Sequence, residues 1–168
     1  AFKYMQVRTG TIAGVPDCFM WRIGFTGELS FELHVPSGHG LHVWNQLLEQ
    51  GKDLGVSAFG LEAQRIMRLE KGHFIVGQDT DGLSKMPVTG MMGLVKFDKD
   101  DFAGKAELAW AVDDKHPALV AIQPVDPTVV PEEACQIVKE GTNEILGRIT
   151  SSRMSPTLGR SVCLGQVD

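Results

Sequence analysis

The chain has 168 residues, enough for one ordinary domain or for a domain with a smaller appendage. Hydrophobic residues make up 43% and charged residues 22%, which is typical of a globular protein rather than a disordered or fibrous one. The net charge of −5 argues against a general binder of nucleic acids or anionic membranes, because both need positive charge.

The first part of the chain has the alternation of antiparallel strands. Residues 7–11 and 18–25 are predicted strands joined by the turn AGVPD, and a third strand over residues 29–35 follows the turn FTGE. In the third strand, apolar side chains alternate with polar ones. The pattern therefore places a carboxylate, Glu32, in the middle of a strand.

Apolar residues then recur at helical spacing. Residues 40–50 and 60–71 are predicted helices, with Gly51 and Gly72 as their C-terminal stops. Arg68 falls on the polar side of the second helix. It has two interpretations: an exposed ion pair, which would be worth little, or an anchor for a carboxylate or a buried loop. The pattern alone favours the exposed ion pair.

The middle of the chain carries weaker signals. A short strand from residue 73 is expected to run into the acidic turn DTDG, residues 79–82. This turn opens like a calcium loop, but the twelfth position is Gly90 instead of Glu, so an ordinary Asp-rich turn is the better interpretation. Residues 85–97 predict a loop and then a strand, and residues 101–112 predict a helix.

The last part of the chain changes character. LVAIQPV, ACQIVKEG, EILGRITSS and RSVCLGQV are four short β-rich runs, and EGTN, residues 140–143, is typical of a hairpin loop. We therefore expect an α+β fold. Residues 1–114 would form a domain of helices packed on antiparallel strands, and residues 115–168 a small antiparallel β-barrel.

The cysteines indicate a reducing compartment. Cys18, Cys135 and Cys163 are odd in number and far apart, so they form neither a disulfide framework nor a CxxC site. The sequence also has no signal peptide and no apolar run long enough to cross a bilayer. The expectation is a cytoplasmic protein that does not bind membranes or nucleic acids.

Three histidines, His34, His39 and His42, fall within nine residues. Neutral imidazoles so close together could bind a metal, but no Cys or carboxylate completes the set nearby. They span a strand end, a loop and a helix start. We therefore expect no metal site and interpret these histidines as solvated surface residues.

Glu32 has two interpretations. It could be a solvated strand residue that discourages edge pairing, or a carboxylate aimed into a pocket to accept paired N–H bonds from a flat ring. Phe25, which precedes the turn, could supply an aromatic wall to such a pocket or be an ordinary core residue. The residue pattern alone favours the solvated residue.

Several motifs together, in this order, resemble the aminomethyltransferase family. They are FTGELSFELHVP, WNQLL, GLEAQRIMRLEKG, VGQDTDG, DFAGKAEL and GRITSSRMSPTLGRSVCLGQV. The family includes the glycine-cleavage T-protein and the folate-binding halves of sarcosine oxidase and dimethylglycine dehydrogenase. The resemblance covers nearly the whole chain, and RLEKG with IVGQDTDG is most similar to the alpha subunit of heterotetrameric sarcosine oxidase.

The resemblance implies a tetrahydrofolate site. In the family, the second Glu of a TGE-x-x-x-E pattern holds the pterin ring, and that position is Glu32. Phe25 stands where a Tyr is usual, so the ring wall is kept without its hydroxyl. Gln64 stands where the T-protein branch has an Arg that contacts folate, which favours the amine-oxidising branch. The family's catalytic Asp lies in an N-terminal stretch outside this chain, so no catalytic residue is assigned.

The resemblance also implies an activity for a longer parent protein, of which this chain is expected to be an inactive fragment. The parent would pass a one-carbon unit from an oxidised amine to tetrahydrofolate, giving 5,10-methylenetetrahydrofolate. Flavin and NAD would bind other parts of an oxidase complex with other subunits. The alternatives are a free-standing glycine-cleavage aminomethyltransferase and a non-catalytic folate-binding or assembly module. Because a truncated domain exposes apolar surface, we also expect dimerisation or crystal contacts over that face.

Overall fold

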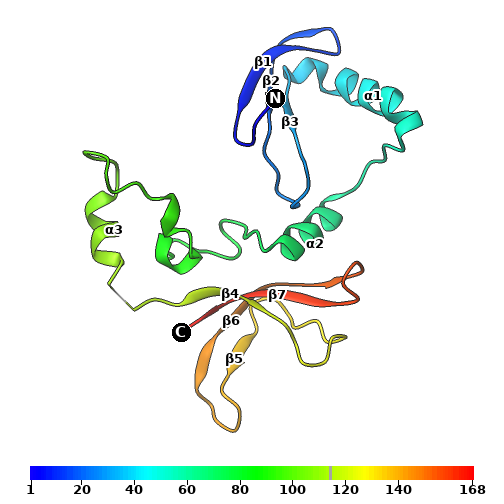
Figure 1. Ribbon diagram of the computed structural model, residues 1–168. Coiled ribbons are helices and arrows are strands. Elements are labelled where there is room, and N and C mark those ends of the chain that lie inside the picture. The colour runs from blue at the N-terminus through cyan, green and yellow to red at the C-terminus, as the bar shows by residue number, and fades with distance from the viewer. Residues whose placement is uncertain (114) are drawn as a thin grey trace. The chain divides into compact units, whose positions relative to one another are not determined.

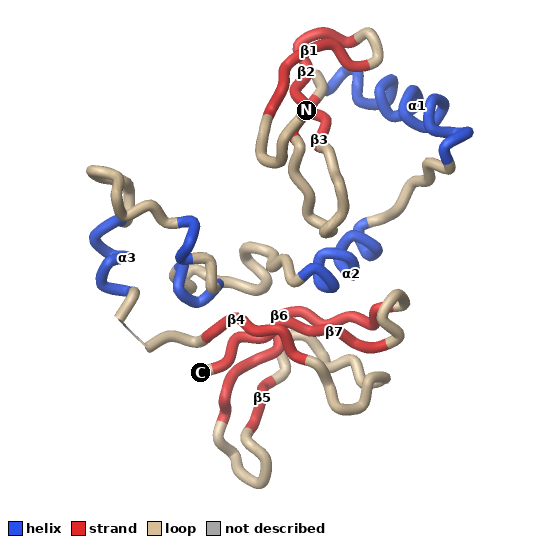
Figure 2. The backbone as a smooth tube through the Cα atoms, in the orientation of Figure 1, coloured by secondary structure: helices blue, strands red, loops and turns tan. Residues whose placement is uncertain are grey.

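The computed structural model of the chain describes residues 1–113 and 115–168 (Figure 1). The chain divides into two compact units, Ala1–Met67 and Arg68–Asp168. Figure 2 shows that the strands form two separate sheets, and all strand pairs within each sheet are antiparallel. The predicted α+β class is confirmed. Among the residues that the structure describes, no helix has the length and apolar character needed to span a membrane.

The sheet of the first unit has the strand order β1-β2-β3. Strand β1 (Val7–Ile12) and strand β2 (Val15–Trp21) form a hairpin whose turn is only two residues long. Ala13 and Gly14 have φ of 49° and 82°, and positive φ at both central residues is what a type I′ hairpin turn requires. The predicted five-residue turn was therefore too long, and β2 starts and ends earlier than predicted.

Strand β3 covers only Glu32–His34, so the predicted strand over residues 29–35 is wrong at both ends. The chain before it forms bends from Phe25 to Leu29. These bends are tight, because a Cβ on Gly24 would lie 2.9 Å from the carbonyl oxygen of Glu28. Glu32 consequently stands at the start of a short strand instead of the middle of a long one.

Helix α1 (Gly40–Gly51) packs its buried Val43 against the sheet residues Val15 and Cys18. The α-helix ends at Gly51, as the sequence predicts, but the backbone does not turn away there. The chain continues as a 3₁₀ turn, Lys52–Leu54, and stops at Gly55 with φ 75°. Residue 51 must be a glycine for a steric reason, because the side chain of Val56 occupies the space that a Cβ would need.

Helix α2 (Leu61–Lys71) matches its prediction and ends at Gly72, which has φ 81°. The segment that follows it is less regular than predicted. In place of strands, the structure has a single bridge between Val76 and Thr80 and two 3₁₀ helices, Met86–Thr89 and Met92–Leu94.

Helix α3 (Lys105–Ala111) is shorter than the predicted helix over residues 101–112. Gly104, with φ 86°, stands in the left-handed conformation directly before it and so sets its first residue. The Lys105 ammonium group donates hydrogen bonds back to the carbonyl oxygens of Lys99 and Asp100, which closes the preceding turn.

The four predicted C-terminal strands are confirmed as a barrel-like antiparallel sheet of order β4-β7-β6-β5. They are β4 (Ala118–Ile122), β5 (Gln136–Val138), β6 (Ile145–Ser155) and β7 (Arg160–Val167). The EGTN segment closes the β5–β6 hairpin as predicted, with Lys139 and Glu144 bonded through their backbones at 2.9 Å. Leu69 of α2 is buried against Val162 and Leu164 of β7, which places the end of α2 on this sheet.

Candidate functional site

The β2–β3 pair has two chemically different faces. Trp21 is paired with Glu32, and Met20 is paired with Leu33. Because successive side chains of a strand point to opposite faces, Trp21 and Glu32 share one face while Met20 and Leu33 share the other. Leu33 packs against the core cluster that includes Val43 of α1. The face with Trp21 and Glu32 is therefore the one turned away from α1.

The outward face combines a carboxylate with aromatic rings. The Glu32 side chain is 54% exposed, and its Oε2 lies 3.5 Å from Nε2 of His34. The His34 ring is 6.0 Å from that of Trp21, at an angle of 49°. Phe19 is the strand partner of His34 and is also exposed. A carboxylate in this setting can accept two N–H bonds from the edge of a planar ligand, while the aromatic side chains contact its face.

The other two predicted site residues lie outside this ladder. Phe25 is half-buried in the bends that connect β2 to β3, in the segment that leads into Glu32 at the start of β3. Gln64 is half-buried on α2, where its backbone N–H bonds to the Gly60 carbonyl at 3.2 Å. Within the described parts of the chain, no hydrogen bond or ion pair joins Gln64 to Glu32.

Trp21 is a neighbour of Glu32 that the sequence pattern does not predict. The apolar pattern of β2 is visible in the sequence, but the pairing of Trp21 with Glu32 depends on the path of residues 22–31. Those residues were predicted to be largely strand, which would have implied a different register. A one-residue change of register moves a side chain to the opposite face, so the sequence could not identify this neighbour.

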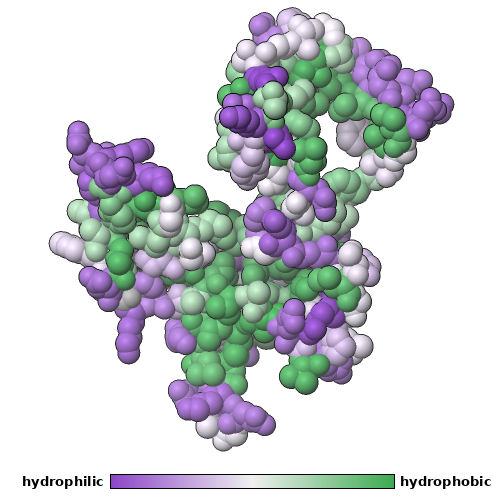
Figure 3. All heavy atoms as spheres, in the orientation of Figure 1, coloured by the Kyte–Doolittle hydropathy of each residue, from purple (hydrophilic) through white to green (hydrophobic). Residues whose placement is uncertain are grey.

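The face of the sheet toward α1 has a different character. An open groove of about 680 Å³ lies between β2, β3 and α1, and the side chains that line it are all apolar. Figure 3 shows that hydrophobic residues, drawn in green, reach the surface of the molecule in several places. In the groove, Phe31 and Trp44 are both exposed. The groove has no charged group to orient a polar ligand, and we therefore place the candidate site on the Glu32 face.

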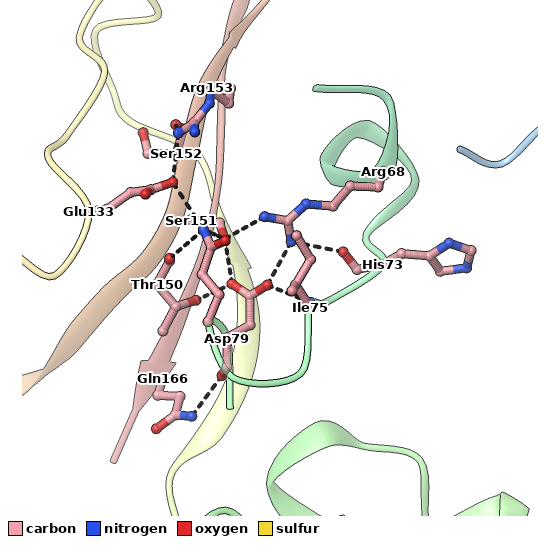
Figure 4. A network of polar contacts seen from close by, with 11 residues as sticks. Arg68, His73, Ile75, Asp79, Glu133, Thr150, Ser151, Ser152, Arg153 and Gln166 are labelled. Atoms are coloured by element: carbon pink, nitrogen blue, oxygen red, sulfur yellow. Dashed lines mark hydrogen bonds and ion pairs between the residues drawn. The ribbon is translucent and has the colours of Figure 1, made fainter. Parts of the chain in front are cut away.

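The second unit contains a buried polar network around Asp79 (Figure 4). Asp79 is 0% exposed and Arg68 is 2% exposed, and the Arg68 Nη1 atom lies 2.6 Å from Asp79 Oδ2. That oxygen also accepts the backbone N–H of Ile75 at 2.8 Å. The hydroxyls of Thr150 and Ser151 on β6 both donate to Oδ1 at 2.6 Å. Both carboxylate oxygens of Asp79 are thus fully used inside the protein.

Further bonds connect this network to neighbouring residues. Arg68 Nη2 and the Gln78 side-chain amide both donate to the Ser151 hydroxyl, at 2.6 Å and 2.9 Å. The Gln166 side chain donates to the backbone oxygen of Asp79 at 2.8 Å. The interpretation of Arg68 as an exposed ion pair is therefore wrong, and it is the anchor of a buried loop. Because the network is closed to solvent, we assign it a structural role.

In the rest of the DTDG turn, Thr80 is buried, whereas Asp81 and Gly82 are exposed. Asp81 accepts hydrogen bonds from Arg148, from the Ser84 hydroxyl and from the backbone N–H of Leu83. These bonds, with that of Arg148 the largest cause, lower the pKa of Asp81 from 3.8 to about 2. The turn is thereby tied to β6, which carries Arg148.

The residues considered for metal or redox chemistry have other environments. His42 contacts the Ala13 carbonyl oxygen at 2.9 Å, whereas His34 contacts Glu32. Over residues 1–113 and 115–168, no group of three or more His, Cys, Asp or Glu side chains is placed to hold a metal ion. Cys18 and Cys163 are buried free thiols, and burial raises the pKa of Cys163.

Comparison with known proteins gives two family matches. The model of the GCVT N-terminal domain matches residues 1–99, and the model of the glycine cleavage T-protein C-terminal barrel domain matches residues 118–168. Sarcosine oxidase subunit alpha of Corynebacterium sp. (strain P-1) is 36% identical over 177 residues, which cover 99% of this chain and 18% of that protein. Aminomethyltransferase of Halothermothrix orenii is 34% identical over 168 residues, which cover 99% and 46% of the two chains.

A solved structure agrees with these matches. The crystal structure of glycine cleavage system aminomethyltransferase T from Bartonella henselae superimposes with a TM-score of 0.83 at 26% sequence identity. The match covers 98% of this chain and 44% of that chain. This chain therefore spans less than half the length of the curated relatives and the solved structure that it matches.

Proposed function

The chain belongs to the glycine cleavage T-protein (aminomethyltransferase) family, and from this membership we propose that it supplies the folate-binding part of a one-carbon transferase. The parent enzyme would transfer a one-carbon unit from an oxidised amine to tetrahydrofolate, giving 5,10-methylenetetrahydrofolate. The observation that carries the proposal is the open face of β2–β3, where the Glu32 carboxylate stands beside aromatic rings.

The residues of this face fit a reduced pterin. The pyrimidine ring of such a pterin is flat and carries several N–H groups along one edge, which a carboxylate accepts in pairs. Glu32 would bind that edge, and its position on a hydrogen-bonded strand restricts the movement of its backbone. Phe25 would contact the ring from the β2–β3 connection, and Gln64 would bind the folate through its side-chain amide.

The role of this chain in the reaction is to bind and orient. Tetrahydrofolate itself supplies the nucleophilic nitrogen, so the protein must hold that nitrogen toward the one-carbon donor and exclude competing water. Glu32 does so by fixing the ring through its edge. Strand placement limits the freedom of the side chain, which lowers the entropy cost of binding.

The assignment to an oxidase is a further part of the proposal. Sarcosine oxidase subunits alpha are among the relatives that cover nearly all of this chain, and Gln64 in place of an Arg agrees with that branch. Other subunits and other parts of the parent would then carry the flavin and NAD sites. We also propose a domain boundary near residue 114 and a cytoplasmic location; the first is supported by residues 100–117 lying between the two family matches.

The experiment follows the fate of the one-carbon unit in the intact parent enzyme. With sarcosine and tetrahydrofolate, the wild-type enzyme should release mainly 5,10-methylenetetrahydrofolate. Glu32→Gln should divert at least half of that carbon to free formaldehyde while amine oxidation continues at its original rate. The control Glu49→Gln, an exposed position on α1, should leave the ratio of the two products unchanged. An unchanged ratio in Glu32→Gln would contradict the site.

The second candidate is a free-standing aminomethyltransferase, which the solved T-protein structure favours. Such an enzyme takes its substrate from a lipoyl carrier protein. The two candidates differ in the donor of the one-carbon unit. The transferase would be supported if methylenetetrahydrofolate forms from an aminomethylated lipoyl carrier and does not form during amine oxidation.

A further inference from the structure

Trp21 is the aromatic side chain that the fold places directly opposite Glu32. The two residues are partners in the antiparallel β2–β3 ladder. Side chains of such partners have Cβ atoms about 4.5–5.5 Å apart and stand on the same face. A ligand edge held by the Glu32 carboxylate therefore brings the ligand's ring within reach of the indole.

Trp21 is partly exposed to solvent and does not belong to the hydrophobic core of its sheet. The indole is 39% exposed, although Met20, its neighbour in β2, faces the apolar side of the sheet. Phe19, on the same face as Trp21, is exposed as well. Large aromatic residues side by side on the open face of a sheet are typical of a surface that binds something flat or apolar.

His34 completes the shape of this surface. Its ring is tilted by 49° to that of Trp21, and its Nε2 lies 3.5 Å from the Glu32 carboxylate. The carboxylate is thus bordered by two rings, one across the ladder and one along the strand. In this arrangement a flat ligand can meet an aromatic face and a hydrogen-bond acceptor at the same time.

We propose that Trp21 is the stacking platform for the pterin ring of the bound folate, with Glu32 holding the ring's N–H edge. This inference rests on the proposed function and adds a ligand-contacting residue to it. Stacking selects for a planar π-system, and the carboxylate selects for an N–H-rich edge. The pair therefore discriminates against saturated amines and against aromatic acids, each of which satisfies only one of the two contacts.

The test uses the tryptophans of the intact protein, which in this chain are three: Trp21, Trp44 and Trp110. The W44F/W110F double variant leaves Trp21 as the only tryptophan of the chain, so selective excitation of tryptophan reports on it alone. Titration with 5-formyltetrahydrofolate, a stable reduced folate, should quench its emission along the same binding curve that calorimetry gives. The W21F/W110F variant, which leaves Trp44 on α1, should show clearly weaker quenching.

Affinity measurements provide the second readout. Trp21→Leu should weaken 5-formyltetrahydrofolate binding roughly five- to 100-fold, the range of a lost stacking contact. Trp21→Phe should recover most of it, because a ring is restored. Trp110→Leu, which removes an exposed tryptophan of α3 that is not part of the β2–β3 ladder, should change the affinity less than about twofold.

The outcomes separate the two claims. Wild-type affinity in Trp21→Leu, together with weak binding by Glu32→Gln, would overturn the role of Trp21 and leave the proposed function standing. Binding without quenching of Trp21 would do the same, and does not depend on how well Trp21→Leu folds. No binding of any reduced folate by the wild-type protein would overturn both.

Discussion

Asp79→Asn is expected to destabilise the second unit far more than a surface charge change would. The substitution removes the charge that neutralises Arg68, which is 2% exposed and 2.6 Å from Asp79. It also puts an amide nitrogen where one carboxylate oxygen accepted hydrogen bonds. Removing one partner of a buried pair costs about 3–5 kcal/mol, because the other charge is left uncompensated.

The magnitude can be measured by urea unfolding followed by circular dichroism. With a dependence of about 2 kcal/mol per molar urea, the expected loss lowers the midpoint by about 2 M. Hydrogen exchange of peptides from β6 and β7 should show the same change, since Thr150 and Ser151 of β6 bond to Asp79. That readout assigns the effect to the second unit.

The control is Glu144→Gln, which removes an exposed ion pair with Lys139 at 3.0 Å. Exposed pairs contribute about 0–1 kcal/mol, so the urea midpoint should hardly move. Arg68→Met combined with Asp79→Asn should cost less than the sum of the two single changes, because each already breaks the same pair. If Asp79→Asn costs no more than Glu144→Gln, the network does not hold the fold as described.

Two further predictions concern the same sheet. Arg148→Gln should raise the pKa of Asp81 from about 2 toward 3.8, as followed by NMR, and an unchanged pKa would refute the contact. Because the pKa of Asp81 is lowered in the folded state, its ion pair with Arg148 stabilises the fold above pH 3.8 and loses this effect as the pH falls toward 2. Gly147→Ala should destabilise by roughly 1–3 kcal/mol in urea unfolding, because its Cβ would meet the Gln166 carbonyl, whereas Gly82→Ala, in open space, should be neutral; equal effects would contradict the packing.

The regular elements with strong local signals were predictable from the sequence. The C-terminal strands are short β-rich runs separated by Gly, Asn and Pro turns, and α2 has both helical spacing and a terminal glycine, Gly72. The bends at Phe25–Leu29 were not predictable, because their apolar and aromatic residues also fit a strand. Their conformation is set by contacts such as the approach of Gly24 to Glu28.

The polar network had a signal in the sequence that was overlooked. Thr150, Ser151 and Ser152 form a run of hydroxyl residues in a strand with apolar residues around it, and all three are buried. Buried hydroxyls need hydrogen-bond partners, so such a run in a strand that is expected to be buried indicates polar groups packed against it. Which groups these are could not be deduced, since Arg68 and Asp79 meet β6 only through the tertiary fold.

The candidate site was predicted only in part. Glu32 and Phe25 were identified from the resemblance to the family, whereas the pattern of the strand favoured a solvated carboxylate. The sequence could not show that Trp21 stands opposite Glu32, because strand register decides which side chain has that place.

The most direct test of the folate site is a calorimetric titration of tetrahydrofolate into the intact protein and into its Glu32→Gln and Glu49→Gln variants. Hydrogen bonds to a charged group are worth about 1.5–3 kcal/mol, so Glu32→Gln should weaken binding by roughly ten- to 100-fold. Glu49→Gln, on the exposed surface of α1, should bind as the wild type does. Equal affinity of the wild type and Glu32→Gln would contradict the role assigned to this carboxylate.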